Sequence, residues 1–359
     1  MKKKNNFLNT YKNLKVLVTG STGFKGAWLA YWLNLLGAKV VGIALKPEKG
    51  SIIFDSLKLE SKIKQYFINI QNFEKINSIF KKEKPDIVFH LAAQSIVSLS
   101  YKNPLETFST NIIGSANILE AARINKTPNL VYITSDKCYL NLDKKKNYKE
   151  EDFLGGIDNY SSSKASAEII FRSYFESYFK KSFLSVASAR AGNVIGGGDF
   201  KSNRIVPDVI KSLNSDKSII LRNPNATRPW QHVLEPLSGY LLLGEKLINK
   251  KLRSNIKPSW NFGPYPRNCK KVRFIVNLIK KNWSIKNKVL IKVEKNKKFY
   301  ESKLLSLNIK KAEKELSWRP KLSFNETIEM TVNWYKNYFS NNNIEKITKS
   351  QIEFYSNKK

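Results

Sequence analysis

Three evenly spaced glycines lie where an apolar run gives way to a helical pattern near the start of the chain. Residues 16–26 read VLVTGSTGFKG, and Gly20, Gly23 and Gly26 are three residues apart. The run before Gly20 is typical of a buried parallel strand, and residues 26–38 have the apolar spacing of a helix. Glycine here allows a tight turn and close approach of a phosphate to the helix N-terminus. A plain strand-to-helix connection is the alternative, but both flanking elements favour a phosphate-binding turn.

Strands and helices continue to alternate along the first half of the chain. The patterns predict strands at 39–45, 86–93, 129–135 and 182–190, and helices at 72–85, 111–125 and from about Tyr160. Such an order calls for a parallel sheet with helices on both faces and right-handed connections. The predicted fold class is therefore α/β, with a Rossmann-type doubly wound parallel sheet.

The regular alternation ends after Arg190. A glycine-rich loop follows at 191–200, residues 223–230 are turn-like, 258–264 read as a lone strand, and the chain from about Arg267 is helical and basic. We expect a first domain over 1–192, with a returning segment at about 228–264. A smaller, discontinuous C-terminal α/β domain would consist of 193–227 and 265–359.

The formal net charge of +34 raises the question of a nucleic-acid or membrane partner. The excess is mostly scattered lysine without an arginine-rich block, and no apolar run reaches the roughly 18 residues of a membrane span. We therefore expect a solvated basic surface, no specific nucleic acid and no membrane, with a minor role for the charge in attracting anionic substrates. The two cysteines, Cys138 and Cys269, fit a reducing compartment, and the basic start lacks the apolar run of a signal peptide. These features predict a soluble cytoplasmic protein.

A tyrosine and a lysine lie four residues apart in the predicted helix that begins near 160. This spacing places Tyr160 and Lys164 on one helix face, where the lysine charge is expected to lower the tyrosine pKa from about 10. Such a tyrosine can take the proton of an alcohol while a hydride leaves its carbon. The pair alone is a common helical pattern. Ser135 ends a strand 25 residues earlier and would hydrogen-bond the same substrate oxygen.

The glycine spacing and the Ser135, Tyr160 and Lys164 set resemble the short-chain dehydrogenase superfamily. This resemblance implies a first domain that binds NAD through Gly20, Thr22, Gly23, Phe24, Gly26, Asn69, Ile70, Ala92, Ala93, Gln94, Asn111, Tyr160 and Lys164. Two positions depart from the pattern. Ala44, Leu45 and Lys46 stand where an acidic residue would hold the adenosine ribose, so the choice between NAD and NADP stays open. Asn69-Ile70 replaces the Asp-Ile pair that related enzymes carry near the adenine.

Asp136 and Lys137 follow Ser135 directly, at the strand end where open α/β sheets carry their active sites. A solvated turn pair is the plain alternative. With VTGSTGFKGAWL, FHLAAQ, ARAGNVIGGGDF and NPNATRPWQHVLEPLSGYLLL, the pair closely resembles CDP-glucose 4,6-dehydratases, from about Lys15 to Tyr335. Dehydratases that act on thymidine-linked glucose carry Asp-Glu here. The resemblance implies a lyase of deoxysugar and polysaccharide biosynthesis, which converts CDP-glucose to CDP-4-dehydro-6-deoxyglucose and water.

The resemblance also implies an internal redox cycle. Tyr160 deprotonates the 4-hydroxyl while NAD takes hydride from carbon 4, water leaves across carbons 5 and 6, and hydride returns to carbon 6. Asp136 would be the acid for the departing 6-hydroxyl. Lys137 as the base at carbon 5 needs a neutral amine, with a pKa lowered by burial or by Lys164. Alternatively, Lys137 stabilises the enolate and another group or water takes the proton.

Substrate contacts are expected from both parts of the chain. By the resemblance, the loop Gly196–Asp199 approaches the nucleotide, and the substrate-binding residues are Gln94, Ser135, Asn193, Arg204 and Arg228. The arginine fork suits phosphate groups, and Arg222 is a weaker candidate. We expect His90, His232 and Cys138 to be structural, and no cluster has metal-ligand spacing.

Two rival functions stay open. One is an epimerase, or a 4,6-dehydratase that acts on another nucleotide sugar, although an epimerase has no need of Asp136-Lys137 to eliminate water. The other is a non-enzymatic, basic dinucleotide-fold binding protein, which would have no use for Ser135, Tyr160 and Lys164. As a partner other than the substrate CDP-glucose, we expect a second copy of the chain, in a homo-oligomer (dimer or tetramer).

Overall fold

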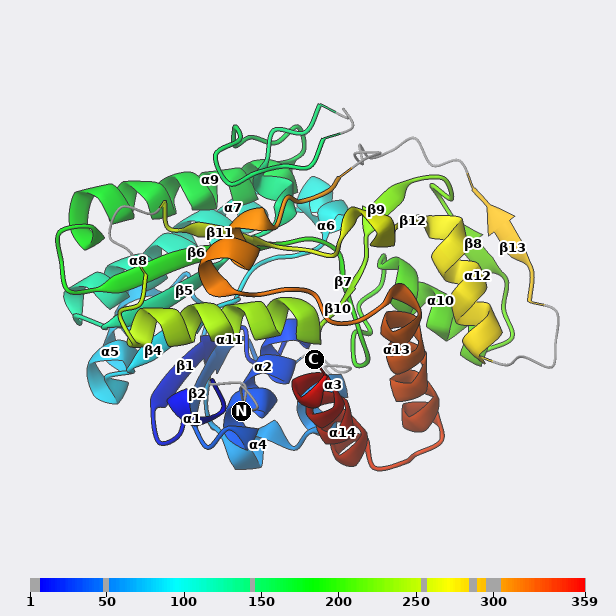
Figure 1. Ribbon diagram of the computed structural model, residues 1–359, viewed down its shortest axis with the longest axis horizontal. Helices are drawn as coiled ribbons and strands as arrows, with labels where there is room; N and C mark the ends of the chain where they lie inside the picture. The colour runs from blue at the N-terminus through cyan, green and yellow to red at the C-terminus, as the bar shows by residue number, and fades with distance from the viewer. Residues whose placement is uncertain are drawn as a thin grey trace.

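The centre of the protein is a seven-stranded parallel sheet (Figure 1). A computed structural model describes residues 7–47, 52–142, 146–252, 257–283, 289–294 and 305–358. The strand order is β11-β6-β5-β4-β1-β2-β3, the doubly wound order with one further strand at the β6 edge. The strands are β1 (Lys15–Thr19), β2 (Lys39–Ala44), β3 (Lys64–Phe67), β4 (Ile87–His90), β5 (Asn129–Ile133), β6 (Ser185–Ala191) and β11 (Ser259–Phe262).

Helices cover both faces of this sheet, and its central strands are apolar on both faces. In β1, Val16 and Val18 belong to one hydrophobic cluster and Leu17 to another, as alternating side chains of a strand require. The first cluster packs under α2 (Phe24–Leu35) and α11 (Leu234–Ile248). The second packs under α5 (Phe73–Glu83), α8 (Ser115–Ile124) and α9 (Asn159–Tyr174). The remaining helical segments of the large part are α1 (Phe7–Thr10), α3 (Ile52–Ser56), α4 (Leu59–Lys62), α6 (Val97–Lys102), α7 (Pro104–Phe108), the π-helical η1 (Ser109–Gly114) and η3 (Phe175–Phe179), and the 3₁₀ turn η2 (Asp136–Cys138).

A smaller part lies beyond the carboxyl ends of the strands, on the right of Figure 1. Its helices are α10 (Ile205–Asn214), α12 (Val272–Trp283) and α13 (Phe324–Phe339), with the short turn η4 (Pro266–Asn268). The turn η5 (Ala312–Leu316) instead packs on β11 and α11 of the large part. Short strand pairs complete it: β7 (Val194–Ile195) with β10 (Gln231–His232), β9 (Thr227–Pro229) with β12 (Cys269–Lys271), and β8 (Ile219–Leu221) with β13 (Ile291–Val293).

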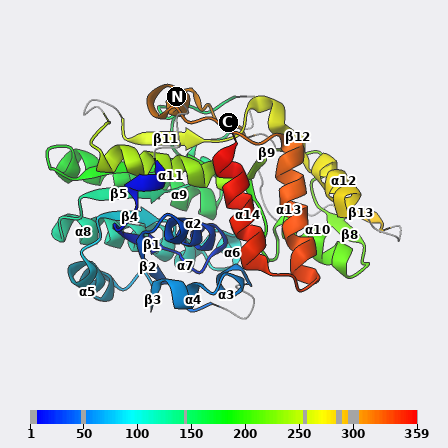
Figure 2. The same ribbon diagram turned by 60° about the horizontal axis from the view of Figure 1, so that its bottom comes forward.

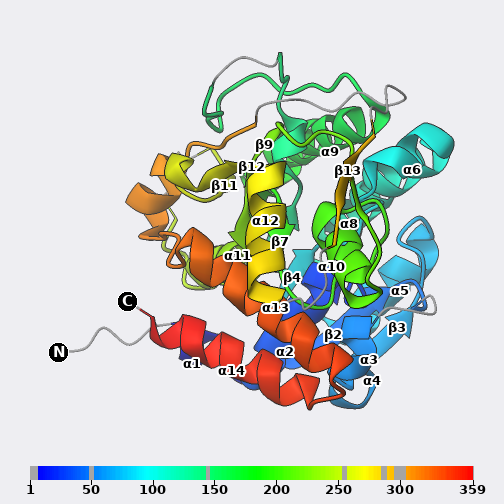
Figure 3. The same ribbon diagram turned by 90° about the vertical axis from the view of Figure 1, so that its right-hand side faces the viewer.

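The last helix, α14 (Ile344–Asn357), runs beside α13 and returns to the large sheet domain (Figures 2 and 3). The ring of Tyr355 lies 5.9 Å from that of Trp32 in α2, edge to face. Lys62 and Glu345 form an ion pair of 3.3 Å across the same contact. The end of the chain therefore supports the helix that follows the glycine turn.

One loop connects the two parts through two tryptophans. The Trp28 indole N–H of α2 donates to the Gly197 carbonyl oxygen at 2.9 Å. A Cβ on Gly197 would lie 1.9 Å from Cγ of Trp334 in α13. Only glycine fits this position, because the two rings enclose the backbone.

The predicted fold class is confirmed. The segment 258–264, which reads as a lone strand in the sequence, is β11 and pairs in parallel with β6 in the main sheet. The helical text expected after Arg267 also contains β12 and β13, and residues 284–288 and 295–304 of it lie outside the described residues. The predicted domain bounds stay a prediction, since one hydrophobic cluster extends through both parts.

The basic start of the chain, through Asn6, also lies outside the described residues. Within the described ranges, no helix combines the length and apolarity that a bilayer crossing demands.

Candidate active site

The glycine turn has the geometry that the sequence predicts. Gly20 has φ of +73°, and a Cβ there would lie 2.9 Å from the Ala92 backbone nitrogen. A Cβ on Gly26 would lie 2.0 Å from the Gly20 carbonyl oxygen, so strand and helix approach as only glycine allows. Gly23 is the N-cap of α2, Phe24 is its first residue, and no side chain caps the helix. The N–H groups of this first turn are thus available to an anion.

The other predicted cofactor positions lie around this turn or beside it. The Thr22 hydroxyl donates to the Leu45 carbonyl oxygen at 3.2 Å, which connects the turn to the end of β2. Ala92 and Ala93 follow β4, and the Ala92 N–H donates to the Thr19 hydroxyl at 3.1 Å. Asn69 and Ile70 follow β3; Ile70 is buried, and the Asn69 side chain accepts from the Gln71 N–H at 3.0 Å.

Gln94 and Asn111 connect the loop after β4 to α9, the helix that carries Tyr160 and Lys164. The side-chain Oδ1 of Asn111 accepts from the Gln94 backbone N–H at 2.8 Å. Its amide group donates to the Gln94 carbonyl oxygen at 3.0 Å and to the Ser163 hydroxyl at 2.9 Å. Asn111 is fully buried, so its amide serves these internal contacts. The sequence placed Asn111 near the cofactor; the structure adds that it holds α9.

Ser135 forms the N-cap of the turn η2, directly after β5. Its hydroxyl donates to Asp136 Oδ1 at 3.0 Å and accepts from the Lys137 backbone N–H at 3.2 Å. The serine thus fixes the direction of the two residues that follow it. The turn lies at the carboxyl end of β5, and one strand, β4, separates β5 from β1, which leads into the glycine turn.

Asp136 is a buried carboxyl group with a free oxygen. It is 3% exposed, and its Oδ2 has no hydrogen-bond partner among the described residues. Burial raises the pKa of Asp136, although Lys137, Ser135 and Arg228 act in the opposite direction. A Cβ on Gly192 would lie 3.1 Å from this Oδ2, so the glycine leaves room for the carboxyl group. The arrangement favours a protonated acid that can donate.

Tyr160 and Lys164 both point from α9 into the protein and are 8% and 5% exposed. Burial raises the pKa of Tyr160 to about 12, although the Ser135 hydroxyl lowers it by hydrogen bonding. The prediction that Lys164 lowers the pKa of Tyr160 was therefore wrong for the protein without a bound cofactor or substrate. Burial also lowers the pKa of Lys164 to about 7, so the lysine itself is only partly charged at neutral pH.

Lys25, within the glycine turn, is a further charged residue of the site. Burial and the charge of Arg204 lower the pKa of Lys25 to about 8, while Asp136 raises it. Its ammonium lies 5.9 Å from the centre of the Tyr240 ring. Lys25 was not among the residues predicted for the site, although a lysine directly before Gly26 is visible in the sequence.

Of the predicted substrate residues, Gln94 and Ser135 lie in the large part, and Asn193, Arg204 and Arg228 follow β6 or lie in the smaller part. Arg228 in β9 is buried, and its charge lowers the pKa of Asp136. Arg204 donates to Asp199 Oδ2 at 2.7 Å and to the Ser95 hydroxyl at 2.6 Å, and so bridges both parts. Asn193 follows β6, and its carbonyl oxygen accepts from the Gln231 N–H at 3.1 Å. Arg222 instead donates to Asn203 on the exposed side at 2.6 Å.

The residues expected to be structural are buried. His90 contacts the hydroxyls of Thr19 and Ser115 at 2.7 and 3.0 Å, and burial lowers the pKa of both His90 and His232 to about 3. Burial raises the pKa of Cys138, which is fully buried. In the parts of the chain that the structure describes, no group of His, Cys, Asp and Glu side chains could hold a metal ion.

These side chains fit a dinucleotide cofactor. The uncapped first turn of α2 offers N–H groups to a pyrophosphate, and the close Gly20–Gly26 contact leaves the backbone bare. The buried Lys164 ammonium lies one helical turn from Tyr160 on α9, and ribose hydroxyls could accept its hydrogen bonds. Tyr160, Ser135 and Asp136 lie together at the carboxyl end of β5, where they can accept or donate protons.

Comparisons with known proteins agree with this geometry. The family model described as GDP-mannose 4,6 dehydratase matches residues 17–331. The chain is 38% identical to a CDP-glucose 4,6-dehydratase of Salmonella typhimurium, over 97% of this chain and 97% of that protein. It is 30% identical to a dTDP-D-glucose 4,6-dehydratase of Dictyostelium discoideum, over 65% of this chain and 56% of that protein.

Solved structures show the same fold. A dTDP-glucose 4,6-dehydratase of Bacillus anthracis in complex with NAD matches with a TM-score of 0.75 and 23% identity, over 90% of this chain and 97% of that one. A UDP-glucose 4-epimerase of Thermotoga maritima with UDP-glucose matches with a TM-score of 0.78 and 22% identity, over 91% of this chain and 100% of that one. With the family model over most of its length and a relative of 38% identity, the chain belongs to the GDP-mannose 4,6-dehydratase family.

Proposed function

We propose that the protein is an NAD-dependent lyase that converts CDP-glucose to CDP-4-dehydro-6-deoxyglucose and water. The observation that carries this proposal is the turn Ser135-Asp136-Lys137, which follows the inner strand β5 and lies beside the helix α9 with Tyr160 and Lys164. The serine, tyrosine and lysine suit oxidation of an alcohol, and the buried acid suits elimination of water. The Salmonella relative, named a CDP-glucose 4,6-dehydratase, supports the choice of substrate.

The cofactor in this proposal is NAD. Gly20, Thr22, Gly23, Phe24 and Gly26 would hold its pyrophosphate, and Tyr160 and Lys164 its nicotinamide ribose. Asn69, Ile70, Ala92 and Ala93 would line the adenosine side, with Gln94 and Asn111 next to them. When bound, NAD accepts a hydride from the sugar and later returns it. The B. anthracis relative contains NAD, which supports NAD rather than NADP.

Tyr160 takes the proton of the sugar 4-hydroxyl. The Ser135 hydroxyl hydrogen-bonds the phenol and acts against the rise of its pKa by burial. A cationic ligand beside the phenol would lower this pKa further, as would a charged Lys164. Tyr160 therefore becomes a base in the assembled complex rather than in the chain alone.

Asp136 protonates the 6-hydroxyl as it departs. Burial raises the pKa of this carboxyl group, which favours the protonated form that can give its proton to the leaving group. Its Oδ1 is held by Ser135, and its Oδ2 faces no protein donor or acceptor among the described residues. The free Oδ2 is the atom that we assign to the proton transfer.

Lys137 acts at carbon 5, next to Asp136 on the same turn. As a neutral amine it takes the carbon 5 proton, which the new ketone at carbon 4 has acidified. Lys137 as a cation that stabilises the enolate, with water taking the proton, is the alternative within the same proposal. Arg228 and Arg204 hold the diphosphate, and Asn193 and Gln94 contact the sugar nucleotide from either side.

We also propose a homo-oligomer in the cytoplasm. Apolar side chains are exposed on the adjacent segments α7, η1 and α9, among them Leu105, Ile113 and Ile169. A second copy would cover them. Both cysteines are free thiols, which fits a reducing compartment. Light scattering of the purified protein measures the oligomeric state, and a monomer at micromolar concentration would contradict the proposal.

The decisive experiment is incubation of the purified protein with CDP-glucose, UDP-glucose and dTDP-glucose in parallel. We expect loss of one water from CDP-glucose by mass spectrometry, together with the alkaline chromophore of a 4-keto sugar. A product of unchanged mass would indicate an epimerase. Preferred turnover of UDP-glucose or dTDP-glucose would retain the reaction and change the substrate. No turnover of any sugar would favour the non-enzymatic binding protein.

A further inference from the structure

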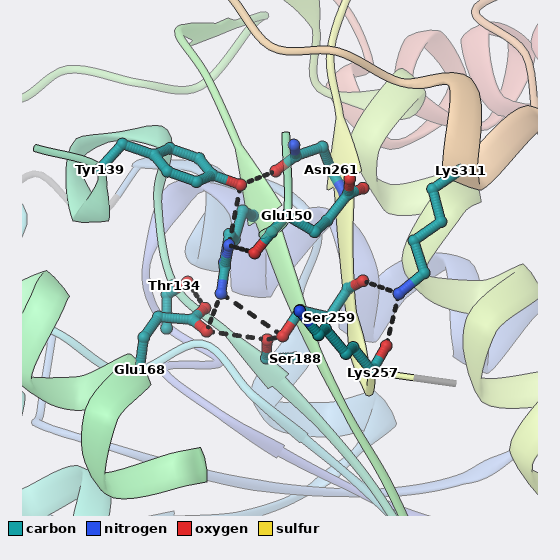
Figure 4. Close-up of polar contacts among 10 residues, drawn as sticks. Thr134, Tyr139, Glu150, Glu168, Ser188, Lys257, Ser259, Asn261 and Lys311 are labelled. Atoms are coloured by element: carbon teal, nitrogen blue, oxygen red, sulfur yellow. Dashed lines mark hydrogen bonds and ion pairs between the residues drawn. The ribbon is translucent and has the colours of Figure 1, made fainter. Parts of the chain in front are cut away.

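The last two strands of the sheet carry a polar face under α9, where a covered parallel sheet is ordinarily apolar. Ser188 pairs with Ser259, and Arg190 with Asn261, so four polar side chains lie together across β6 and β11 (Figure 4). The intervening residues of β6, Ala187, Ala189 and Ala191, point to the other face and belong to the main apolar core.

A buried ion pair lies at the centre of this face. The Arg190 guanidinium donates to Glu168 Oε2 at 2.7 Å, and the two side chains are 4% and 1% exposed. Ser188 donates to the same Oε2 at 3.0 Å. Buried pairs of this kind add little stability compared with apolar residues of similar volume, because both ions lose their hydration. The pair therefore needs another explanation than stability.

The contacts of the pair enclose the catalytic turn. The Thr134 hydroxyl, directly before Ser135, donates to Glu168 Oε1. The Tyr139 hydroxyl, directly after Cys138, accepts from Arg190 Nη1 at 2.8 Å and donates to Asn261 Oδ1 at 2.7 Å. Figure 4 shows both side chains directed at the pair from opposite ends of the turn.

Glu168 also connects this pair to the other catalytic residues. It lies on α9 four residues after Lys164 and eight after Tyr160, a spacing that keeps all three near one helix face. The far side is anchored as well: Arg190 Nη1 donates to the Glu150 carbonyl oxygen at 3.1 Å, and the Lys311 ammonium to the Ser259 carbonyl oxygen at 2.8 Å. Turn, helix and two strands thus meet at one ion pair.

We propose that Glu168 and Arg190 are positioning residues that fix the turn 135–138 against α9 through Thr134 and Tyr139. The inference rests on the proposed function, since it assigns a purpose to the turn. The pair touches no substrate. The ion pair acts by holding the Ser135 hydroxyl and the Asp136 carboxyl group at a fixed position relative to the Tyr160 phenol.

The test removes one contact at a time in the NAD-loaded enzyme. Thr134→Val deletes the hydroxyl that binds Glu168 and keeps the shape, whereas Thr134→Ser keeps the hydroxyl. Tyr139→Phe deletes the contact at the other end of the turn. We expect Thr134→Val and Tyr139→Phe each to lower kcat about tenfold with KM within about twofold, because misplacement of acid and serine affects the transition state. Thr134→Ser should restore native kcat.

Tyr355→Phe is the matched control. The Tyr355 hydroxyl is also buried and donates to a carboxylate, Glu235 Oε2 at 2.7 Å, far along the chain from the turn. It should lower the melting temperature as Tyr139→Phe does and leave kcat unchanged. An equal fall of kcat in Tyr355→Phe, or native kcat in both turn variants, would overturn the proposal.

A second readout does not depend on the reaction. Hydrogen–deuterium exchange of residues 135–142 in the NAD-loaded protein should become faster in Thr134→Val and Tyr139→Phe, and not in Tyr355→Phe. If no nucleotide sugar is turned over but exchange changes in this way, the proposed function fails and the positioning role stands. Unchanged exchange in both turn variants contradicts the positioning role. If Thr134→Val does not fold, Tyr139→Phe decides by the same two measurements.

Discussion

Tyr160 must lose a proton although burial raises its pKa to about 12. Tyr160→Phe removes the only phenol that we assign to the 4-hydroxyl and leaves the ring in place. We expect the first oxidation to fall by about 100-fold or more, because a positioned base contributes about that factor. Single-turnover measurement with CDP-glucose should show no reduced-nicotinamide absorbance. Oxidation at the native rate would remove Tyr160 from the mechanism.

Asp136→Asn should fail in a different way. The amide retains the shape of the carboxyl group and cannot protonate the departing 6-hydroxyl. Oxidation at carbon 4 should therefore proceed while elimination stalls, and reduced-nicotinamide absorbance should persist after a single turnover. The native enzyme is the control, with no net growth of this absorbance during turnover. Elimination at the native rate in Asp136→Asn would assign the acid to Lys137 or to water.

Lys25 sets the electrostatics of the site from within the glycine turn. Its charge lowers the pKa of Lys164, after the larger effect of burial, and also lowers the pKa of Asp136. Without it, Lys164 stays protonated and Asp136 stays a proton donor at higher pH. We expect Lys25→Met to shift the alkaline limb of kcat upward by up to about one pH unit. Lys75→Met, on the exposed face of α5, is the control, and a shift to lower pH would refute this role.

The contact of α14 with α11 contains a titrating carboxyl group. Glu235 lies in the first turn of α11 and accepts from the Tyr355 hydroxyl and the Leu322 N–H. Burial raises the pKa of Glu235 from 4.5 to about 7, a difference of about 3 kcal/mol at 1.4 kcal/mol per unit. The folded state therefore binds a proton that the unfolded state releases, and stability from this group falls as the pH rises from about 4.5 to 7.

Glu235→Gln should remove that dependence. We expect the free energy of unfolding of the variant to decline less than that of the native protein between these two pH values. Urea titrations at several pH values measure the difference, and the other groups cancel when the two curves are subtracted. A difference that does not vary with pH in this window would contradict the raised pKa.

The sequence predicted best those elements that local patterns define. The strand before Gly20 and the Tyr160–Lys164 spacing depend on residues within one or two turns, and both were correctly placed. β3, with Lys64 and Gln65, lies at the sheet edge and has too little apolar alternation to stand out. The ion pair of Glu168 with Arg190 joins residues 22 positions apart on different elements, so spacing alone did not show it. The predicted lowering of the Tyr160 pKa was wrong because burial of the phenol, which raises the pKa, depends on the tertiary structure.

The charge of +34 is a property of the complete chain. If its lysines form a solvated surface, binding to RNA should be weak, without sequence preference, and strongly reduced by salt. Fluorescence anisotropy with two labelled RNAs of different sequence, at low and at physiological salt, measures this. Tight and selective binding at physiological salt would reopen the interpretation as a nucleic-acid-binding protein.

The enclosure of Gly197 between Trp28 and Trp334 also limits how the family can exchange parts. Any loop with a side chain at position 197 would collide with the Trp334 ring, because a Cβ there lies 1.9 Å from its Cγ. Grafting the 196–199 segment alone should therefore damage the host, whereas grafting it with the facing surfaces of α2 and α13 should not. Substrate preference would then be transferred between proteins only by exchanging three distant segments of the chain together, and not by exchanging one loop.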